Sequence, residues 1–189
     1  MRVAGHVRKI GVRGDGASGH NCRMNANPST APMRFADPGV SLYAVAENGI
    51  QVVCPVCQDR AEVVPWLDGQ PRSLYSIGWP RRLACRACGH VKDWPGEAKH
   101  AISCWGSPVD PYFRQPLWLR ADCCGNRTLW AFNERHLDIL EGYVGAQLRE
   151  RGERPGMTML ARLPGWMKSA KHRTEILRVI GRLRASLSQ

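Results

Sequence analysis

The chain has 189 residues, a net charge of +11 and eight cysteines. Its length allows one domain with a hydrophobic core and a helical extension. The longest apolar runs fall far short of the ~18 residues that span a bilayer, and no hydrophobic block follows the basic residues near the N-terminus. These features argue against membrane insertion and secretion, and they predict a cytoplasmic protein.

The positive charge is concentrated at the two ends of the chain. Residues 1–33 carry a net charge of +4, and residues 143–189 carry a net charge of +7. Such an excess favours polyanionic partners, nucleic acid above all, although a solubilising surface accounts for the charge equally well. In a reducing compartment the cysteines are expected to be ligands, core residues or reactive thiols rather than disulfides.

The first segment, residues 1–38, is rich in Gly, Asn, Ser and Pro and has no sustained apolar period. It cannot bury enough surface to offset its ordering entropy, so we expect a disordered basic leader. Ordered structure is expected from about Val40. β-Favouring residues run from there to Val53, and Ala61–Val64 is predicted as a second short strand.

Two cysteine pairs enclose the next segment: Cys54 with Cys57, and Cys85 with Cys88, in the pattern C-x2-C-x27-C-x2-C. Thiolates at positions i and i+3 of a tight turn converge on one point, and two such turns complete a tetrahedron around Zn²⁺. The pattern therefore predicts a structural four-cysteine zinc site. Residues 39–132 are expected to form a zinc ribbon followed by a Trp-rich β-hairpin.

The residues beside the cysteines fit this prediction unequally. Gly89 follows the second pair, where a left-handed backbone is easiest without a Cβ, whereas Gln58 occupies the equivalent position after the first. An iron–sulfur cluster also uses four cysteines and stays open as an alternative. A thioredoxin-like dithiol needs only one such pair beside a βαβ unit, and no parallel-sheet pattern is present.

About 45 residues around the two CxxC turns resemble the zinc ribbons of transcription factor B and of many RNA polymerase subunits and replication proteins. The segments PLWLRADCCGNRTLWAFNERHLDILEGYV and LARLPGWMKSAKHR resemble a group of small bacterial zinc-ribbon proteins of unknown function. Some of those carry names borrowed from the primosomal replication restart helicase. The resemblance implies a fold and a metal rather than an activity, and this chain lacks the G-x-x-x-x-G-K-[ST] phosphate loop of that helicase.

Residues 116–133 predict the β-hairpin. Two short strands, Leu117–Arg120 and Thr128–Phe132, flank a turn at Gly125 and Asn126. Each strand carries a Leu-Trp pair, and neighbouring side chains of a strand point to opposite faces. The hairpin is therefore expected to be covered on both sides.

Cys123 and Cys124 lie within this hairpin and raise the question of a second metal site with His100 and Cys104. Adjacent side chains of a strand diverge, so both thiols could bind one ion only if the chain bends sharply, which Gly125 permits. The plainer interpretation is one buried and one partly exposed thiol.

Helical periodicity dominates residues 133–189, which are expected to form a basic helical region packed on the hairpin. Asn133 is a plausible N-cap for a first helix with an apolar stripe of Leu137, Leu140, Val144 and Leu148. A short helix is expected after Thr158, interrupted or kinked at Pro164. The last helix carries its apolar residues on one face, at Ile176, Ile180, Leu183 and Leu187. The predicted fold class is therefore α+β.

Basic residues of this region are the candidate nucleic-acid contacts: Lys168, Lys171, Arg173, Arg178 and Arg182. Lys and Arg neutralise phosphates, and Trp166 among them could stack on an unpaired base. The alternative is that Trp166 fills the core and the charges are only solvated.

No clustered carboxylates, nucleophile elbow or open metal site is visible in the sequence, so no enzymatic activity and no small-molecule substrate are expected. His136, in the first turn of a helix, is expected to face solvent or to form a hydrogen bond. The favoured function is a non-enzymatic nucleic-acid-associated module. The alternative is a protein-interaction adaptor that uses the ribbon and a Trp-rich surface, and a redox or zinc-dependent enzyme would need a reactive thiol such as Cys123 or Cys124.

Overall fold

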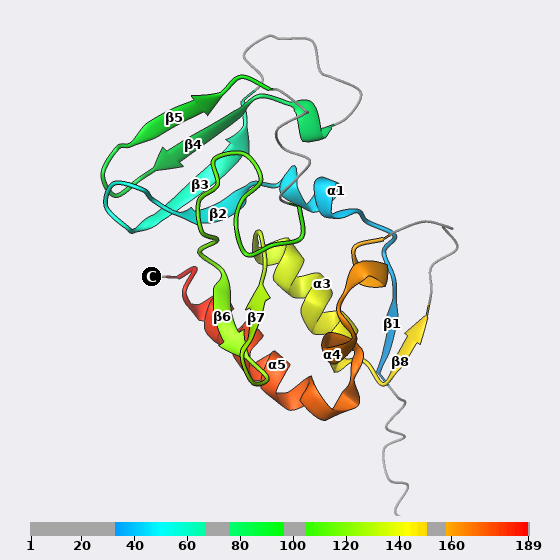
Figure 1. Ribbon diagram of the computed structural model, residues 1–189. Coiled ribbons are helices and arrows are strands. Elements are labelled where there is room, and N and C mark those ends of the chain that lie inside the picture. The colour runs from blue at the N-terminus through cyan, green and yellow to red at the C-terminus, as the bar shows by residue number, and fades with distance from the viewer. Residues whose placement is uncertain (1–32, 67–75, 97–104, 151–157, 189) are drawn as a thin grey trace, which may run out of the picture. The chain divides into compact units, whose positions relative to one another are not determined.

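The computed structural model of the protein describes residues 33–66, 76–96, 105–150 and 158–188 (Figure 1). Every described residue belongs to one compact unit, which spans residues 32–189. Its elements are β1 (Arg34–Ala36), α1 (Leu42–Ala46), β2 (Ile50–Val53), β3 (Arg60–Pro65), η1 (Ser76–Gly78), β4 (Arg81–Cys85), β5 (Val91–Trp94), β6 (Arg120–Cys123), β7 (Arg127–Trp130), α3 (Glu134–Gly145), β8 (Leu148–Glu150), η3 (Leu160–Arg162), α4 (Gly165–Lys168), η4 (Ala170–His172) and α5 (Arg173–Ala185). Antiparallel strands followed by C-terminal helices confirm the predicted α+β class.

Strands β2, β3, β4 and β5 form one antiparallel sheet in that order (Figure 1). Alternate side chains of the strands point to one face, where Ile50, Val52, Val63 and Leu83 are fully buried. The register pairs Ala61 with Cys85. The buried face therefore fixes the position of the second cysteine turn, because Cys85 is the last residue of β4.

The sequence prediction for residues 40–53 was wrong in its first half. Leu42–Ala46 forms helix α1, and only Ile50–Val53 is a strand. The Ser41 hydroxyl accepts a hydrogen bond from the N–H of Ala44 at 3.2 Å and caps the helix. This N-cap outweighs the β propensity of the tyrosine and valine that follow it.

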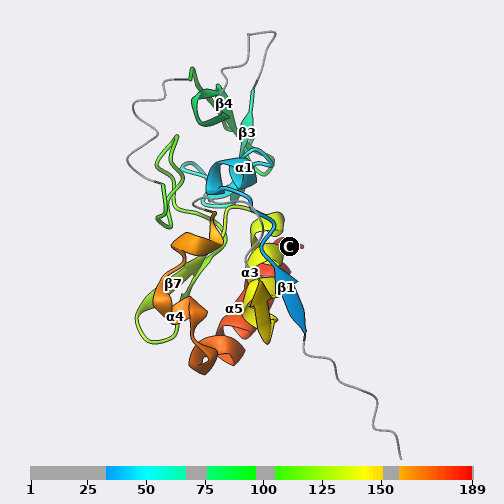
Figure 2. The ribbon, with the colours of Figure 1, turned by 90° about the vertical axis from the view of Figure 1, so that its right-hand side faces the viewer.

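Strand β1 lies inside the range for which the sequence predicts a disordered leader. Of that range, residues 1–32 lie outside the described part of the chain. Arg34–Ala36 pairs in parallel with β8, Leu148–Glu150. The ring of Phe35 packs edge-on against Tyr143, so β1 lies along α3 (Figure 2). Pairing with β8 also accounts for Leu148, which the sequence places on the helical stripe although α3 ends at Gly145.

The β6–β7 hairpin is shifted along the chain relative to the prediction. Arg120–Cys123 pairs with Arg127–Trp130, and the predicted turn at Gly125 and Asn126 is present. Leu117, expected in the first strand, instead forms a bridge with Val52 of the four-stranded sheet. The buried side chains before β6 therefore join the hairpin to that sheet.

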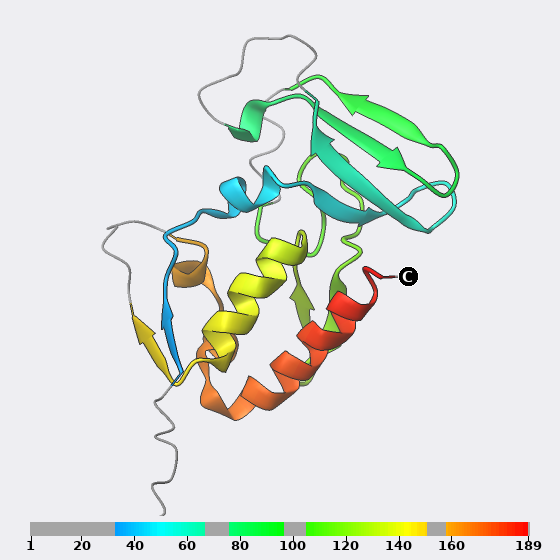
Figure 3. The same ribbon diagram turned by 180° about the vertical axis from the view of Figure 1, so that it is seen from behind.

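Helices α3 and α5 lie side by side (Figure 3). Their facing stripes are buried, as the sequence predicts, and consist of Leu137, Leu140 and Val144 on α3 and Ile176, Ile180 and Leu183 on α5. Outside this apolar contact, Arg184 forms ion pairs with three acidic residues of α3, Glu134, Asp138 and Glu141. Within the described residues, no helix is both long enough and apolar enough to cross a membrane.

Asn133 connects these helices to α1. Its side-chain oxygen accepts from the N–H of His136 at 3.0 Å and caps α3, as the sequence predicts. Its side-chain nitrogen donates to the carbonyls of Val45 and Gly49, at 2.8 and 2.7 Å. One buried amide therefore fixes the start of α3 against the end of α1.

Candidate metal centre and aromatic pocket

The two CxxC segments form two turns with the same hydrogen bonds. The carbonyl of Cys54 accepts from the N–H of Gln58 at 3.0 Å, and that of Cys85 accepts from Gly89 at 3.0 Å. Each of these cysteines also donates its N–H to a carbonyl five residues further on, at 2.8 and 2.9 Å. Gln58 adopts a φ of 64° and Gly89 a φ of 73°. Gln58, which the sequence marks as less favourable, therefore takes the same left-handed conformation as the glycine.

These turns bring four sulfur atoms together, and we call Cys54, Cys57, Cys85 and Cys88 the sulfur site. All four Sγ atoms lie within 4.8 Å of one another. The Sγ atoms of Cys54 and Cys88 are 3.7 Å apart, and those of Cys57 and Cys85 are 3.6 Å apart. A tetrahedron with metal–sulfur distances of about 2.3 Å has sulfur–sulfur edges of about 3.8 Å. The sulfur site therefore has the dimensions required to hold one metal ion.

Crowding of the four thiols spreads their pKa values. Burial disfavours the thiolate of Cys54, but backbone N–H donors from Cys57 and Val56 and the neighbouring thiols outweigh it and lower its pKa to about 7. The N–H of Asp59 favours the thiolate of Cys57, yet burial and the other thiols raise its pKa to about 12. One thiol of the sulfur site therefore loses its proton easily and the next does not, because two thiolates at this distance repel each other. A bound cation would remove that repulsion.

The cysteine pair in the β6–β7 turn, Cys123 and Cys124, forms a second group of sulfur atoms. Both residues are buried, and their Sγ atoms lie 3.0 Å apart. A carboxylate oxygen of Glu175 lies within 4.8 Å of both. His100 and Cys104, which the sequence suggested as further ligands, lie outside the described residues.

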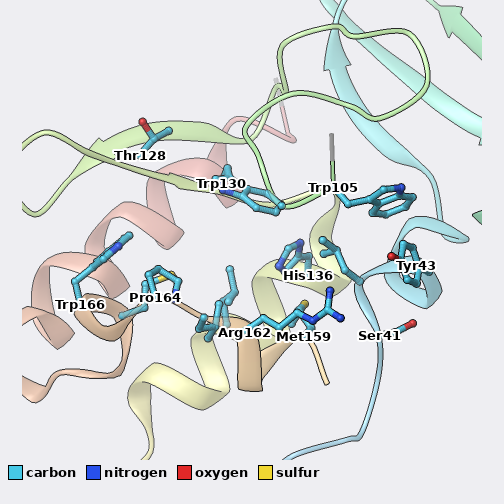
Figure 4. Close-up of a pocket in the computed structure, with 15 residues that line it drawn as sticks. Ser41, Tyr43, Trp105, Thr128, Trp130, His136, Met159, Arg162, Pro164 and Trp166 are labelled. Atoms are coloured by element: carbon cyan, nitrogen blue, oxygen red, sulfur yellow. The ribbon is translucent and has the colours of Figure 1, made fainter. Parts of the chain in front are cut away.

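A pocket opens between α1, β7, α3 and the η3–α4 segment (Figure 4). Its cavity volume is about 420 Å³, within the range of small-molecule and cofactor sites. Aromatic and apolar side chains form most of its wall, and we call it the aromatic pocket. It is lined by Ser41, Leu42, Tyr43, Trp105, Gly106, Thr128, Trp130, His136, Leu140, Met159, Arg162, Leu163, Pro164, Trp166 and Met167.

The polar groups that line the aromatic pocket include the side chains of His136, Trp105 and Arg162. His136 is buried, and its Nδ1 accepts the N–H of Phe132 at 3.1 Å. Burial lowers the pKa of His136 to about 3, so the ring is neutral and carries its proton on Nε2. The indole nitrogen of Trp105 is buried and has no hydrogen-bond partner in the described part of the chain. The guanidinium of Arg162 is exposed and has no ion pair or hydrogen bond with any described residue.

Of the two roles predicted for His136, the structure shows the hydrogen bond and not the solvent-facing position. The pocket itself was missed at the sequence level, because its walls come from five separate segments. The spaced tryptophans of the chain were the available signal, but nothing in their spacing shows that Trp105, Trp130 and Trp166 meet around one cavity (Figure 4).

The predicted nucleic-acid contacts do not all have the same surroundings. Lys168, Lys171, Arg178 and Arg182 are exposed, and we call these four residues the basic face. Arg173 is half-buried and donates to the carbonyl of Ala146 at 3.0 Å, just after α3. Arg173 is therefore held by the fold. The other four side chains are exposed, although the Nζ of Lys168 also donates to the carbonyl of Ala161 at 3.0 Å.

No known family model matches the chain, and neither a curated protein nor a solved structure matches it. Three features of the molecule itself bear on its function: the sulfur site, the aromatic pocket and the basic face.

Proposed function

We propose that this protein is a non-enzymatic module that binds single-stranded nucleic acid and is stabilised by one zinc ion at the sulfur site. The aromatic pocket accepts an unpaired base, and the basic face contacts the phosphates that flank it. The observation that carries the proposal is the guanidinium of Arg162, which has no partner among the described residues and lies in a pocket walled by three tryptophans and a tyrosine. A base offers a flat ring to such a wall, and its phosphate offers a charge to the cation.

Zinc is the proposed occupant of the sulfur site because four cysteine sulfurs lie within 4.8 Å of one another, close enough for one tetrahedral ion. The sulfur–sulfur distances of 3.6 and 3.7 Å match the edges of a tetrahedron around one ion. Four protein ligands leave no open position for a substrate, so the metal has a structural role. With this metal bound, the four-stranded sheet would be a zinc ribbon.

Metal analysis of the purified protein tests this assignment. We expect one zinc per chain by elemental analysis and no visible absorption, since zinc has a filled d shell. Iron in place of zinc, with a coloured protein, would contradict it. Protein folded without any bound metal would remove the structural role.

The pocket supports single-stranded rather than duplex nucleic acid. Stacking on an aromatic ring requires a base whose face is free, as in a single strand. The buried indole nitrogen of Trp105 gains an acceptor if a base oxygen or nitrogen enters. His136, held neutral by burial, presents an Nε2–H donor without adding charge.

The basic face is favoured over a second surface for the phosphates. A groove along the outer face of the four-stranded sheet has four arginines in its wall, Arg60, Arg82, Arg86 and Arg135, but also three acidic residues, Asp59, Glu62 and Glu134. Arg82 is already bound to the carboxylate of Asp93, to which its Nε and Nη2 donate at 2.6 and 2.8 Å. Arg178 and Arg182 have no ion pair among the described residues and lie one helical turn apart on α5. They are therefore free to meet phosphates.

Titration of a fluorescent single-stranded oligonucleotide, followed by anisotropy at several salt concentrations, tests the proposal. Changing the basic face to alanine is expected to weaken binding and to reduce the slope of log affinity against log salt by about 0.7 for each phosphate that the variant no longer neutralises. The matched control changes Arg86 and Arg135 of the sheet groove. Binding that is absent, or insensitive to salt, would contradict the proposal.

The pocket has its own test in the same assay. Trp166→Ala is expected to weaken single-strand binding about 10-fold to 100-fold, because stacking contributes roughly 1–3 kcal/mol per base. Trp66→Ala is the control, since Trp66 is 40 % exposed and lies outside the pocket. Equal losses in the two variants would exclude the pocket as the base site.

An adaptor function is the second candidate, and one observation favours it. Val56, inside the first cysteine turn, is 63 % exposed, and Val91, shortly after the second, is 54 % exposed. Exposed apolar residues beside a rigid site are typical of a protein-binding surface. A stoichiometric protein partner that resists nuclease treatment and is lost in Val56→Ser would favour this function over nucleic-acid binding.

A further inference from the structure

The backbone at the end of β6 turns the cysteine pair, Cys123 and Cys124, to one side. In a regular strand these adjacent side chains would diverge. Cys124 instead has a φ of 53°, and Gly125 and Asn126 follow with φ values of 69° and 55°. This run of left-handed residues brings the two Sγ atoms to 3.0 Å. The bend that the sequence names as a condition for joint action of both thiols is therefore present.

Two hydrogen bonds hold the turn in this unusual conformation. The N–H of Cys124 donates to Oε1 of Glu175 at 2.7 Å, and the carbonyl of Cys124 accepts from the guanidinium of Arg127 at 2.9 Å. A left-handed residue other than glycine is unfavourable, so it persists only when its surroundings fix it. Glu175 belongs to α5, which packs against β6. The pair is therefore held by the fold.

The spacing distinguishes two uses of such a pair. One tetrahedral ion would hold two thiolates about 3.8 Å apart, as the sulfur site does with 3.6 and 3.7 Å. At 3.0 Å the sulfur atoms of the pair are too close for that arrangement. Glu175, the third group in reach, already accepts the backbone N–H of Cys124. The geometry therefore fits bond formation between the sulfurs better than a shared ion.

We propose that Cys123 and Cys124 form a reversible vicinal disulfide when the protein meets a peroxide, and that this turn is a redox modification site. Adjacent Cα atoms are about 3.8 Å apart, below the usual 4.4–6.8 Å of disulfide-linked residues. The crosslink is therefore strained, and a dithiol reductant reopens it readily. This modification site is separate from the sulfur site, where the four thiolates would be bound to a metal ion.

The chemistry needs only the two thiols and the peroxide. The sulfur of Cys124 attacks one peroxide oxygen, the O–O bond breaks and one water leaves, which gives a sulfenic acid on Cys124. The sulfur of Cys123 then attacks that sulfur, the S–O bond breaks, and the hydroxyl leaves as a second water with the proton of Cys123. Two thiols and one hydrogen peroxide thus give one disulfide and two waters.

The order of the two sulfurs follows from their surroundings. Burial raises the pKa of Cys123 to about 12, and the neighbouring thiol adds to this effect. Cys123 therefore stays protonated at neutral pH and acts second. Both side chains are at most 6 % exposed, so a small oxidant such as hydrogen peroxide is expected to reach them better than a bulky disulfide.

Peptide mapping of the metal-loaded full chain tests the proposal directly. Trypsin cleaves after Arg120 and Arg127, and the peptide between them, ADCCGNR, contains this pair and no other cysteine. After treatment with hydrogen peroxide, unfolding and alkylation with N-ethylmaleimide, this peptide is expected to be two hydrogens lighter than the reduced peptide and to carry no alkyl group. Dithiothreitol before alkylation is expected to restore two alkylated thiols.

Each result shows whether or not Cys123 and Cys124 form a disulfide with each other. Full alkylation of this peptide after peroxide treatment would overturn the proposal, and so would sulfinic acid at either residue without a crosslink. Cys123→Ser is expected to give a single oxidised Cys124, whereas Cys124→Ser is expected to leave Cys123 reduced, and the two results together support the assigned order. A crosslink from Cys124 to a cysteine of another peptide in the unmutated protein would also overturn it.

Discussion

The sulfur-site end of the four-stranded sheet and the helical region around α3 and α5 are stabilised in different ways. At the sheet end, two turns place four thiols within 4.8 Å, where ionisation is mutually unfavourable without a cation. In the helical region, apolar side chains such as Leu140 and Ile180 are fully buried in the hydrophobic core. The comparison teaches that the helical region is stabilised by packing, and that the sulfur-site end in addition offers four donors that one metal ion could join.

The largest expected effect comes from removing one cysteine of the sulfur site, which should destabilise the sheet end much more than the helical region. Cys85→Ser is expected to abolish stoichiometric metal binding and to remove most of the roughly 10–16 kcal/mol that a structural zinc ion contributes. Amide hydrogen exchange should then increase throughout β2–β5 and much less in α3. Elemental analysis and exchange mass spectrometry measure the two effects.

Cys124→Ser is the matched control for this prediction, since it changes a buried thiol in the other region. It is expected to keep one metal ion per chain and the protection of the sheet. If both variants lost the metal equally, the two groups of cysteines would not be independent.

Acid is expected to weaken the helical region through His136. The folded pKa of His136 is lowered to about 3 by burial, whereas the unfolded value is about 6.5. The unfolded chain therefore binds the proton first, and stability is lost as pH falls from about 6.5 towards 3, at up to about 1.4 kcal/mol per pH unit.

His136→Gln isolates this contribution, because a glutamine oxygen can still accept the N–H of Phe132 and does not titrate. Between pH 7 and pH 5 the free energy of unfolding, measured with urea, is expected to fall by about 2 kcal/mol less in the variant than in the original protein. Metal release in acid affects both proteins alike. Equal losses in both would show that His136 does not titrate as its burial predicts.

The smallest expected effect compares the two cysteine turns within the sheet end. Gly89→Ala places a Cβ at a φ of +73° where no other atom lies within 4 Å, so its cost is the backbone conformation alone, about 1 kcal/mol. Gln58→Ala exchanges one side chain for another at nearly the same φ and is expected to change stability by less than about 0.5 kcal/mol. Thermal unfolding of the metal-loaded variants measures both. Equal losses would mean that the left-handed conformation does not set the cost.

The parts that could be predicted from the sequence are those that local patterns determine. The CxxC spacing identified all four members of the sulfur site, because a tight turn brings residues i and i+3 together whatever lies between the pairs. The apolar stripes predicted the buried faces of α3 and α5, and Asn133 was identified as the N-cap of α3.

The parts that could not be predicted depend on contacts between distant segments. Helix α1 was taken for a strand because Tyr43 and Val45 favour strands, and the cap at Ser41 decided otherwise. Strand β1 exists through its pairing with β8, more than a hundred residues away. The aromatic pocket required α1, β7, α3 and α4 to meet, which no local pattern records.

Asn133 binds both α3 and the end of α1, and these two helices form part of the wall of the aromatic pocket. Because one side chain caps α3 and also binds the carbonyls at the end of α1, α3 cannot slide along its axis without breaking bonds at both helices. Tyr43 belongs to α1 and His136 to α3, so the same hydrogen bonds hold these two pocket-lining residues relative to each other. Under the proposed function, a bulkier purine and a smaller pyrimidine would therefore meet a pocket of the same width.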